Sequence, residues 1–399
     1  MDSNPFTPGF GLTPRVLAMQ GSPLEDFGEA LAGRRSVGER SVLISGARGV
    51  GKTVLLTQMH DVADLAGWRT IILHTSSTSM VEELRGATVD LLRETDPEAE
   101  SIRPTSATVG AFGARAGAGG ELIDRYDGEA VPLGRLLERL AELLTEEGGG
   151  LVVSIDEVQS ADRDQLHEIA QHMQDLIGRG YAVGFVAAGI RAGVDELLAH
   201  PRTTFLRRAH KVEVGSVDEG TAAEVIRLTV SDTAKSITPE AAVRAGQISR
   251  GYPYLMQVVG SHAWQRSGEA DVIEIEDVEG AREPTIDAMI YNVHGPALRD
   301  ITGRKLEYLY AMIEDEGPSQ VSEIAARMGL NVNNQNVHRS RLIREELIQP
   351  AGRGAVEYAM PYLREALLRL RETGTSSRAA GPARVARPVR HQSGRRGES

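Results

Sequence analysis

Apolar positions follow two alternating periods through the first half of the chain. Short apolar runs typical of strands are separated by longer stretches in which an apolar side chain recurs every three or four residues, as on one face of a helix. This pattern predicts strands over Ser41–Ser45, Thr70–His74, Leu151–Ile155, Tyr181–Ala188 and Lys211–Val214. It predicts helices over Pro23–Ala32, Gly51–Ala66, Ser79–Glu94 with Ser79 as N-cap, Leu133–Thr145, Asp164–Ile177 and Val194–Ala199. Because strands that alternate with helices form a parallel sheet covered on both faces, we expect an α/β core.

Strand patterns end after Gly215, and helical periods continue. We expect an all-α unit with helices over about 217–230, 239–248, 253–267 and 275–293. A third unit should contain helices over about 297–314, 319–328 and 333–346 and a Gly-rich hairpin at Gln349–Met360. The expected divisions are an N-terminal segment (1–40), the core (41–215) with a Gly-rich loop or hairpin insertion (101–131), the all-α unit (216–295), the third unit (296–371) and a disordered basic tail (372–399).

The composition excludes several classes of protein. The 399 residues are 41% apolar, and no apolar run has the length that crosses a bilayer. The chain start lacks a secretory signal, so we expect a cytoplasmic protein without a membrane partner. Without cysteine there is no disulfide, thiol nucleophile or cysteine-ligated zinc, and the histidines have no metal-ligand spacing. A formal charge of −12 argues against a protein that coats nucleic acid with its whole surface, although the tail has six arginines against two glutamates.

A phosphate-binding pattern follows the first predicted core strand. The segment Gly46-Ala-Arg-Gly-Val-Gly51-Lys52-Thr53 fits G-x-x-x-x-G-K-[ST] at every position. Glycines let successive backbone N–H groups face phosphate oxygens, and the helix N-terminus adds positive potential. Lys52 would reach the β- and γ-phosphates, and the Thr53 hydroxyl would bind Mg²⁺. We therefore expect the phosphates of ATP to contact Gly46, Ala47, Arg48, Gly49, Val50, Gly51, Lys52, Thr53 and Val54.

An acidic pair ends another predicted strand. Four of the five residues of Leu151–Ile155 are apolar, and Asp156 and Glu157 follow directly. The carboxylates should therefore emerge at the sheet edge where α/β proteins bind ligands. Asp156 would hold Mg²⁺ together with Thr53, and Glu157 would act as general base on the attacking water.

These two motifs resemble those of the AAA+ superfamily, in particular the bacterial and archaeal ATPases related to the Orc/Cdc6-like clade. The chain start Asn4-Pro-Phe-Thr-Pro-Gly-Phe-Gly-Leu-Thr-Pro14 and the later Gly251-Tyr-Pro-Tyr254, continued to Trp264, resemble that bacterial group as well. The resemblance covers about residues 4–370 and is weakest over 95–131. It implies a P-loop NTPase core of αβα type with a five-stranded sheet, a helical lid and a winged-helix domain.

The resemblance also implies roles for further residues. The N-terminal segment would lie near the adenine, which makes Phe6 to Phe10 candidate contacts. Arg207 and Arg208, just before the last core strand, would act as an arginine finger on the γ-phosphate of a neighbouring copy. The chain departs from the family pattern at two points: the strand Tyr181–Ala188 ends without a polar sensor residue, and the lid lacks a sensor arginine around Gly251–Tyr254. These departures leave nucleotide binding untouched and predict slow hydrolysis.

The third unit has the order of a helix-turn-helix with a wing. Ser319–Leu330 and Asn333–Ile348 would be the two helices, with Gly329 at the corner. Candidate DNA contacts are Asn333, Asn334, Asn336, His338, Arg339, Arg341, Arg344 and, in the wing, Arg353. Ten basic residues balance ten acidic ones over 297–370, so docking of a protein partner stays open beside binding of double-stranded DNA.

The sequence thus predicts an ATPase that converts ATP to ADP and phosphate with Mg²⁺ and transmits its nucleotide state to the winged helix. A second hypothesis is a nucleotide-gated switch that rarely hydrolyses ATP and acts through a protein partner or further copies of itself. A third is a DNA-binding regulator in which ATP controls assembly.

Overall fold

A five-stranded parallel sheet forms the centre of the structure, a computed structural model that describes residues 3–9, 14–16, 21–104, 120–124, 126, 131–199 and 201–379. The strands are β1 (Val42–Ser45), β2 (Arg69–Leu73), β5 (Leu151–Ile155), β6 (Val183–Gly189) and β7 (His210–Glu213). Their spatial order is β2-β5-β6-β1-β7. All five predicted core strands are present, with ends that differ from the prediction by at most two residues.

Burial along the strands follows their place in the sheet. Every residue of the inner strands β5 and β6 is buried, whereas the edge strands β2 and β7 expose two residues each. Continuous apolar runs are typical of strands covered on both faces. The inner strands are therefore the ones with the strongest apolar signal in the sequence.

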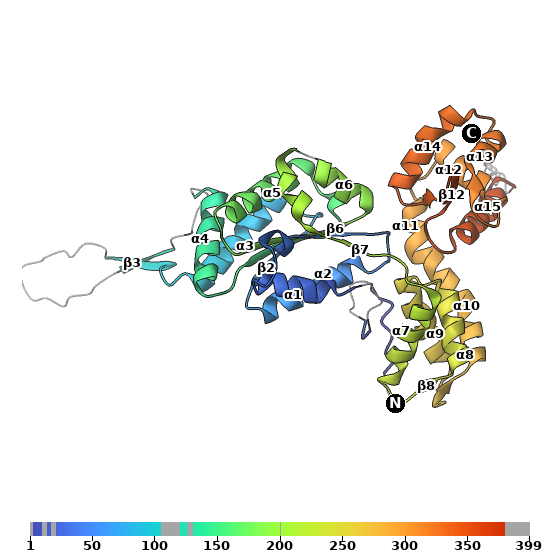
Figure 1. Cartoon of the computed structure of the whole chain (residues 1–399), viewed down its shortest axis with the longest axis horizontal. Helices are drawn as coiled ribbons and strands as arrows, with labels where there is room; N and C mark the ends of the chain where they lie inside the picture. The colour runs from blue at the N-terminus through green and yellow to red at the C-terminus, as the bar shows by residue number, and fades with distance from the viewer. Residues whose placement is uncertain are drawn as a thin grey trace, which may run out of the picture.

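Successive residues of these strands enter two separate cores, as the two-residue period requires. Val42 and Ile44 pack with α1 (Pro23–Leu31) and α2 (Lys52–Leu65). Leu43, between them, packs on the opposite face. That face is covered by α3 (Met80–Thr95), α4 (Leu133–Glu146), α5 (Arg163–Gly178) and α6 (Arg191–Ala199). Figure 1 shows these helices as two layers on either side of the sheet.

Two local predictions in the core have a direct structural outcome. The Ser79 side chain accepts a hydrogen bond from Glu82 N at 3.2 Å, which confirms Ser79 as the N-cap of α3. In the insertion, β3 (Glu100–Pro104) and β4 (Gly120–Asp124) pair as an antiparallel hairpin that extends away from the core (Figure 1). The intervening residues 105–119 lie outside the described part of the chain.

A helical lid (residues 219–289) follows the sheet. It contains α7 (Glu219–Ser231), α8 (Pro239–Ser249), α9 (Pro253–Arg266) and α10 (Ile275–Met289). The prediction of an all-α unit is wrong in one detail, because β8 (Ser236–Ile237) and β9 (Val272–Ile273) form a short parallel pair. Helix α10 continues through the π-helical turn η4 (Ile290–His294) into α11 (Gly295–Leu298).

The C-terminal module (residues 304–379) lies at the far end of this connecting helix (Figure 1). It contains α12 (Arg304–Met312), α13 (Val321–Arg327), α14 (Val332–Arg344) and α15 (Leu363–Ala379). Strands β10 (Ser319–Gln320), β12 (Ala355–Tyr358) and β11 (Ile348–Pro350) form an antiparallel sheet in that order. The predicted corner at Gly329 is present, with φ of 63° between α13 and α14.

Two predictions about this region are wrong. The helix expected over 297–314 is interrupted between α11 and α12, where Gly303 has φ of 57°, a value that a continuous helix does not allow. The segment from 372 to 379, expected to be disordered, is helical, because α15 extends to Ala379. Residues 380–399 lie outside the described part of the chain.

A buried histidine lies in the π-helical turn. His294 is 0% exposed, and its Nε2 forms a hydrogen bond of 2.9 Å with Pro361 O, so Nε2 carries the hydrogen. Within the described ranges its Nδ1 has no hydrogen-bond partner. A second proton would therefore place a charge in an apolar site without an acceptor. Burial accordingly lowers the pKa of His294 to about 4.

We expect the free energy of unfolding to fall as the pH decreases from about 6.5 to about 4. In this window residue 294 takes up a proton in the unfolded chain and stays neutral in the native one; above it, both states are neutral. At about 1.4 kcal/mol per pH unit, the loss is about 3 kcal/mol. Denaturant unfolding between pH 7 and 4 measures it, with His294→Gln as comparison. If the free energy of unfolding changed equally with pH in the wild type and the variant, His294 would be excluded as the cause.

Candidate functional site

The glycine-rich loop Gly46–Thr53 connects β1 to α2, and its glycines are required by its shape. Gly49 and Gly51 have φ of 77° and 98°, in the left-handed region that favours glycine. A Cβ on Gly46 would overlap the carbonyl oxygen of Val214. Because the loop turns sharply here, α2 begins at Lys52, and the positive end of the helix faces the loop.

Lys52 lies across this loop. Its side chain is buried, with 5% of the residue exposed, and Nζ donates to Gly46 O and Ala47 O at 2.8 Å each. Burial lowers the pKa of the ammonium group, and the negative charges of Glu157, Glu346 and Asp156 act in the opposite direction. The loop carbonyls thus hold the ammonium group directly against the glycine backbone.

The two predicted motifs meet at the carboxyl end of the sheet. The Thr53 hydroxyl donates to Asp156 Oδ2 at 2.6 Å. Strand β6, which ends with Ala188 and Gly189, lies between β1 and β5, so this contact joins segments that follow two strands that are not neighbours. Asp156 Oδ1 also accepts a hydrogen bond from Glu157 N at 2.8 Å, which fixes the acidic pair relative to the strand end.

Gln159 is a site residue that sequence reasoning missed. Its Nε2 donates to Glu157 Oε2, and its Oε1 accepts a hydrogen bond from Ile190 N at 3.0 Å. A Cβ on Gly189 would lie 2.7 Å from Gln159 Oε1, so the glycine at the end of β6 makes space for this side chain. Gln159 thus places a polar side chain beside the apolar end of β6, and its position two residues after Glu157 was the signal available in the sequence.

A cavity of about 510 Å³ opens beside the loop, between the core, the N-terminal segment and the lid. This volume is in the usual range for small-molecule sites. Residues 48–55 and Glu157 line its polar end. Its apolar walls come from Pro8, Gly9, Pro14, Val16, Val214, Val225, Pro253 and Met256, with further contacts from Tyr254, Gln257, Asn292, Val293 and Pro296.

The N-terminal segment reaches this cavity in a different way from the one expected. Pro8 and Gly9 line it, but Phe6 is buried in the lid core beside Gly260. Asn4 Nδ2 donates to Ser261 Oγ at 2.9 Å, and Thr7 N donates to Gln257 Oε1 at 3.0 Å. These contacts anchor the segment on α9. Phe10, the other aromatic candidate, lies outside the described residues.

The remaining candidates lie away from the cavity lining. Arg207 and Arg208 are exposed at the end of the 3₁₀ segment η3 (Pro201–Arg208), just before β7. On α14, Asn336, Arg341 and Arg344 are exposed, as is Arg353 in the β11–β12 turn. His338 and Arg339 are half-buried and therefore less accessible than the other candidates. The side chains of Asn333 and Asn334 lie outside the described part.

Two findings concern metals and membranes. In the described ranges, no group of three or more His, Cys, Asp or Glu side chains could hold a metal ion by itself. None of the described helices combines the length and apolar character needed to span a bilayer.

Comparison with known proteins gives two family matches. Residues 17–186 match the model of the AAA ATPase domain. Residues 291–366 match a domain of unknown function (DUF8462). Curated protein sequences contain no significant match.

Among solved structures, the chain is similar to the ORC2 protein of Aeropyrum pernix, solved as ADPNP-ADP complexes. The TM-score is 0.64 at 13% identity, over 94% of this chain and 98% of that one. A Walker-type ATPase of Pyrococcus abyssi gives a TM-score of 0.61 at 14% identity, over 87% and 95% of the two chains. At these identities the likeness establishes the fold, a parallel five-stranded P-loop core with helices. The chain therefore has a P-loop ATPase fold similar to that of these two proteins, and its residues 17–186 match the AAA ATPase domain model.

Proposed function

We propose that the chain binds ATP with Mg²⁺ in the cavity between core and lid and hydrolyses it to ADP and phosphate. The observation that carries this proposal is the 2.6 Å contact between the Thr53 hydroxyl and Asp156, which joins two motifs 103 residues apart at the mouth of the glycine loop. A glycine loop alone is a common turn, whereas a loop, a buried lysine and an acidic strand end at one point form a triphosphate site.

The phosphates would lie along the loop backbone. Free N–H groups and the start of α2 attract anions, and Lys52 would exchange its two carbonyl acceptors for phosphate oxygens. The base and ribose would occupy the apolar part of the cavity near Pro8 and Met256. The proposed ligand thus matches the cavity, which has cationic groups at one end and apolar walls at the other.

Thr53 and Asp156 are suited to hold Mg²⁺. A hydroxyl and a carboxylate are the oxygen ligands that this ion prefers, and it completes its shell with water and phosphate oxygens rather than with a full set of protein ligands. Two protein ligands are therefore enough. When bound, Mg²⁺ supplies positive charge that stabilises the phosphates in hydrolysis.

Glu157 and Gln159 would complete the chemistry. Glu157 lines the cavity at its polar end, where its carboxylate could accept a proton from water attacking the γ-phosphate. The hydrogen bond from Gln159 would orient that carboxylate. Arg207 and Arg208 would contribute only in an oligomer, on the γ-phosphate of a neighbouring copy.

The C-terminal module would transmit the nucleotide state. We propose a winged helix, with α13 and α14 as helix-turn-helix and β11–β12 as wing, that binds DNA through Asn336, Arg341, Arg344 and Arg353.

A second candidate function, a slowly hydrolysing switch that acts through protein partners, is favoured by the apolar end of β6.

Equilibrium binding of fluorescent ADP and ATP analogues, with and without Mg²⁺, tests the nucleotide site. We expect both nucleotides to bind, and the affinity for the triphosphate to fall when Mg²⁺ is chelated. Absence of binding contradicts the proposal.

The rate of phosphate release with and without duplex DNA separates the two candidate functions. If DNA stimulates phosphate release, and the affinity for the duplex falls as the salt concentration rises, the DNA-coupled ATPase is favoured. Slow release unaffected by DNA favours the switch.

A further inference from the structure

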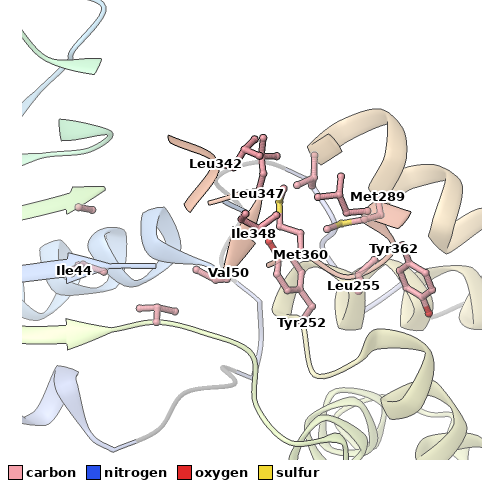
Figure 2. Packing of buried hydrophobic residues seen from close by; sticks show 14 of the residues in the cluster. Ile44, Val50, Tyr252, Leu255, Met289, Leu342, Leu347, Ile348, Met360 and Tyr362 are labelled. Atoms are coloured by element: carbon pink, nitrogen blue, oxygen red, sulfur yellow. The ribbon is translucent and has the colours of Figure 1, made fainter. Parts of the chain in front are cut away.

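The C-terminal module packs directly on the phosphate loop. Val50, at the tip of the loop, is 3% exposed and shares a hydrophobic cluster with Leu347, Ile348 and Met360 of the module and with Tyr252 of the lid. Figure 2 shows Val50 and Tyr252 beneath these three side chains. The Tyr252 ring lies against Gly49, and its hydroxyl donates to Arg48 O. The loop is thus enclosed by two units remote from it in sequence.

Glu346 is the acidic residue that the module presents at this contact. It follows α14 in a Schellman turn, in which Leu347 N donates to Leu342 O and Glu346 N to Ile343 O, each at 3.0 Å. Its φ of 57° is a conformation in which glycine is usual. A glutamate in the left-handed region destabilises the fold, and such strained residues cluster at functional sites.

The carboxylate of Glu346 is buried beside cationic groups. The residue is 9% exposed, and Oε1 accepts a hydrogen bond from Arg191 N at 2.9 Å. In the described part of the chain, Oε2 is buried without a hydrogen-bond partner. Burial raises the pKa of this carboxyl above its usual value, and the bond from Arg191 N and the charges of Lys52, Arg191 and Arg48 oppose that rise only in part. The negative charge of Glu346 in turn favours the charged form of Lys52, whose ammonium group would hold the β- and γ-phosphates.

We propose that Glu346 makes the docked form of the protein selective for a nucleoside diphosphate over a nucleoside triphosphate. This inference rests on the proposed nucleotide site. A diphosphate ends within the loop backbone, whereas the third phosphate of a triphosphate places its charge near a buried carboxylate. Because the Glu346 carboxylate is buried, water screens the repulsion between the two anions only weakly. A triphosphate is then accommodated when the module withdraws from the loop, and its binding shifts the chain toward that open form.

Affinities for ADP and a non-hydrolysable ATP analogue test the proposal in wild type, Glu346→Gln and Glu346→Gly. The glutamine keeps the shape and the acceptor for Arg191 N, and the glycine suits the left-handed backbone, so both variants should fold. We expect each to improve triphosphate affinity relative to diphosphate affinity by about tenfold or more. The matched control is Glu345→Gln, which removes the same charge one residue earlier, where the carboxylate pairs with Lys305 at 2.8 Å.

Energy transfer reports the position of the module. The chain has no cysteine, so Glu146→Cys in the core and Glu316→Cys in the module, both exposed, create a unique pair of label sites. We expect the triphosphate analogue, and not ADP, to lower the efficiency of energy transfer between the two labels. In Glu346→Gln the two nucleotides should give the same efficiency. Unchanged affinity ratios in both Glu346 variants would overturn the inference while leaving the nucleotide site intact. Absence of any nucleotide binding by the wild type would overturn both.

Discussion

Lys52→Ala is expected to lower the affinity for both ADP and ATP by about 100-fold or more. A hydrogen bond to a charged group contributes about 1.5–3 kcal/mol, and Lys52 would make more than one with the phosphates. A tenfold loss corresponds to about 1.4 kcal/mol, so two such bonds account for the effect. Equilibrium titration with fluorescent nucleotides measures it. Both nucleotides should be affected because the ammonium group is held at the loop itself.

The control for this variant separates loss of binding from loss of fold. Lys211→Ala removes the same charge from an exposed position on the edge strand β7, and its nucleotide affinity should equal that of the wild type. Thermal unfolding should show that Lys52→Ala remains folded, although two hydrogen bonds to loop carbonyls are lost. A folded Lys52→Ala protein with unaltered affinity would contradict the site assignment.

Glu157→Gln should leave nucleotide affinity nearly unchanged and reduce the rate of phosphate release by about 100-fold or more, the usual contribution of a general base. The amide keeps the size of the side chain and cannot take a proton from water. Single-turnover phosphate release, together with nucleotide affinity, separates the chemical step from binding. Unchanged turnover in this variant would reject Glu157 as the base.

Gln159→Ala provides a graded comparison. It leaves the Glu157 carboxylate in place but removes the hydrogen bond that orients it, so we expect a smaller loss of turnover, about tenfold, with affinity and unfolding temperature retained. A merely structural role would lower the unfolding temperature without selectively reducing kcat. A Gln159→Ala protein with wild-type turnover would show that the bond seen to Glu157 has no part in catalysis.

Much of the core followed from local sequence pattern. The apolar runs at Leu151–Ile155 and Tyr181–Ala188 predicted the buried inner strands, because a strand covered on both faces can have few polar residues. The loop Gly46–Thr53 could be recognised because its left-handed turns require glycines at fixed spacing. The Ser79 cap was equally local, since it bonds a backbone group three residues away.

Other features depended on how remote segments pack. Phe6 was expected at the nucleotide, yet the lid offers it an apolar pocket beside Gly260. The end of β6 contains no polar side chain, yet Gln159 occupies the space that Gly189 leaves. The break after Leu298 was hidden because the helical period continues across Gly303, the residue that precedes α12.

The sequence by itself determined the elements and the chemical groups of the candidate site, because both arise from residues close together along the chain. The tertiary structure decided which of those groups meet. Glu346 lies almost 300 residues after Lys52, and no periodicity or motif connects them. Their proximity depends on the packing of Leu347, Ile348 and Met360 against Val50, a contact between surfaces that form only when the separate units have folded.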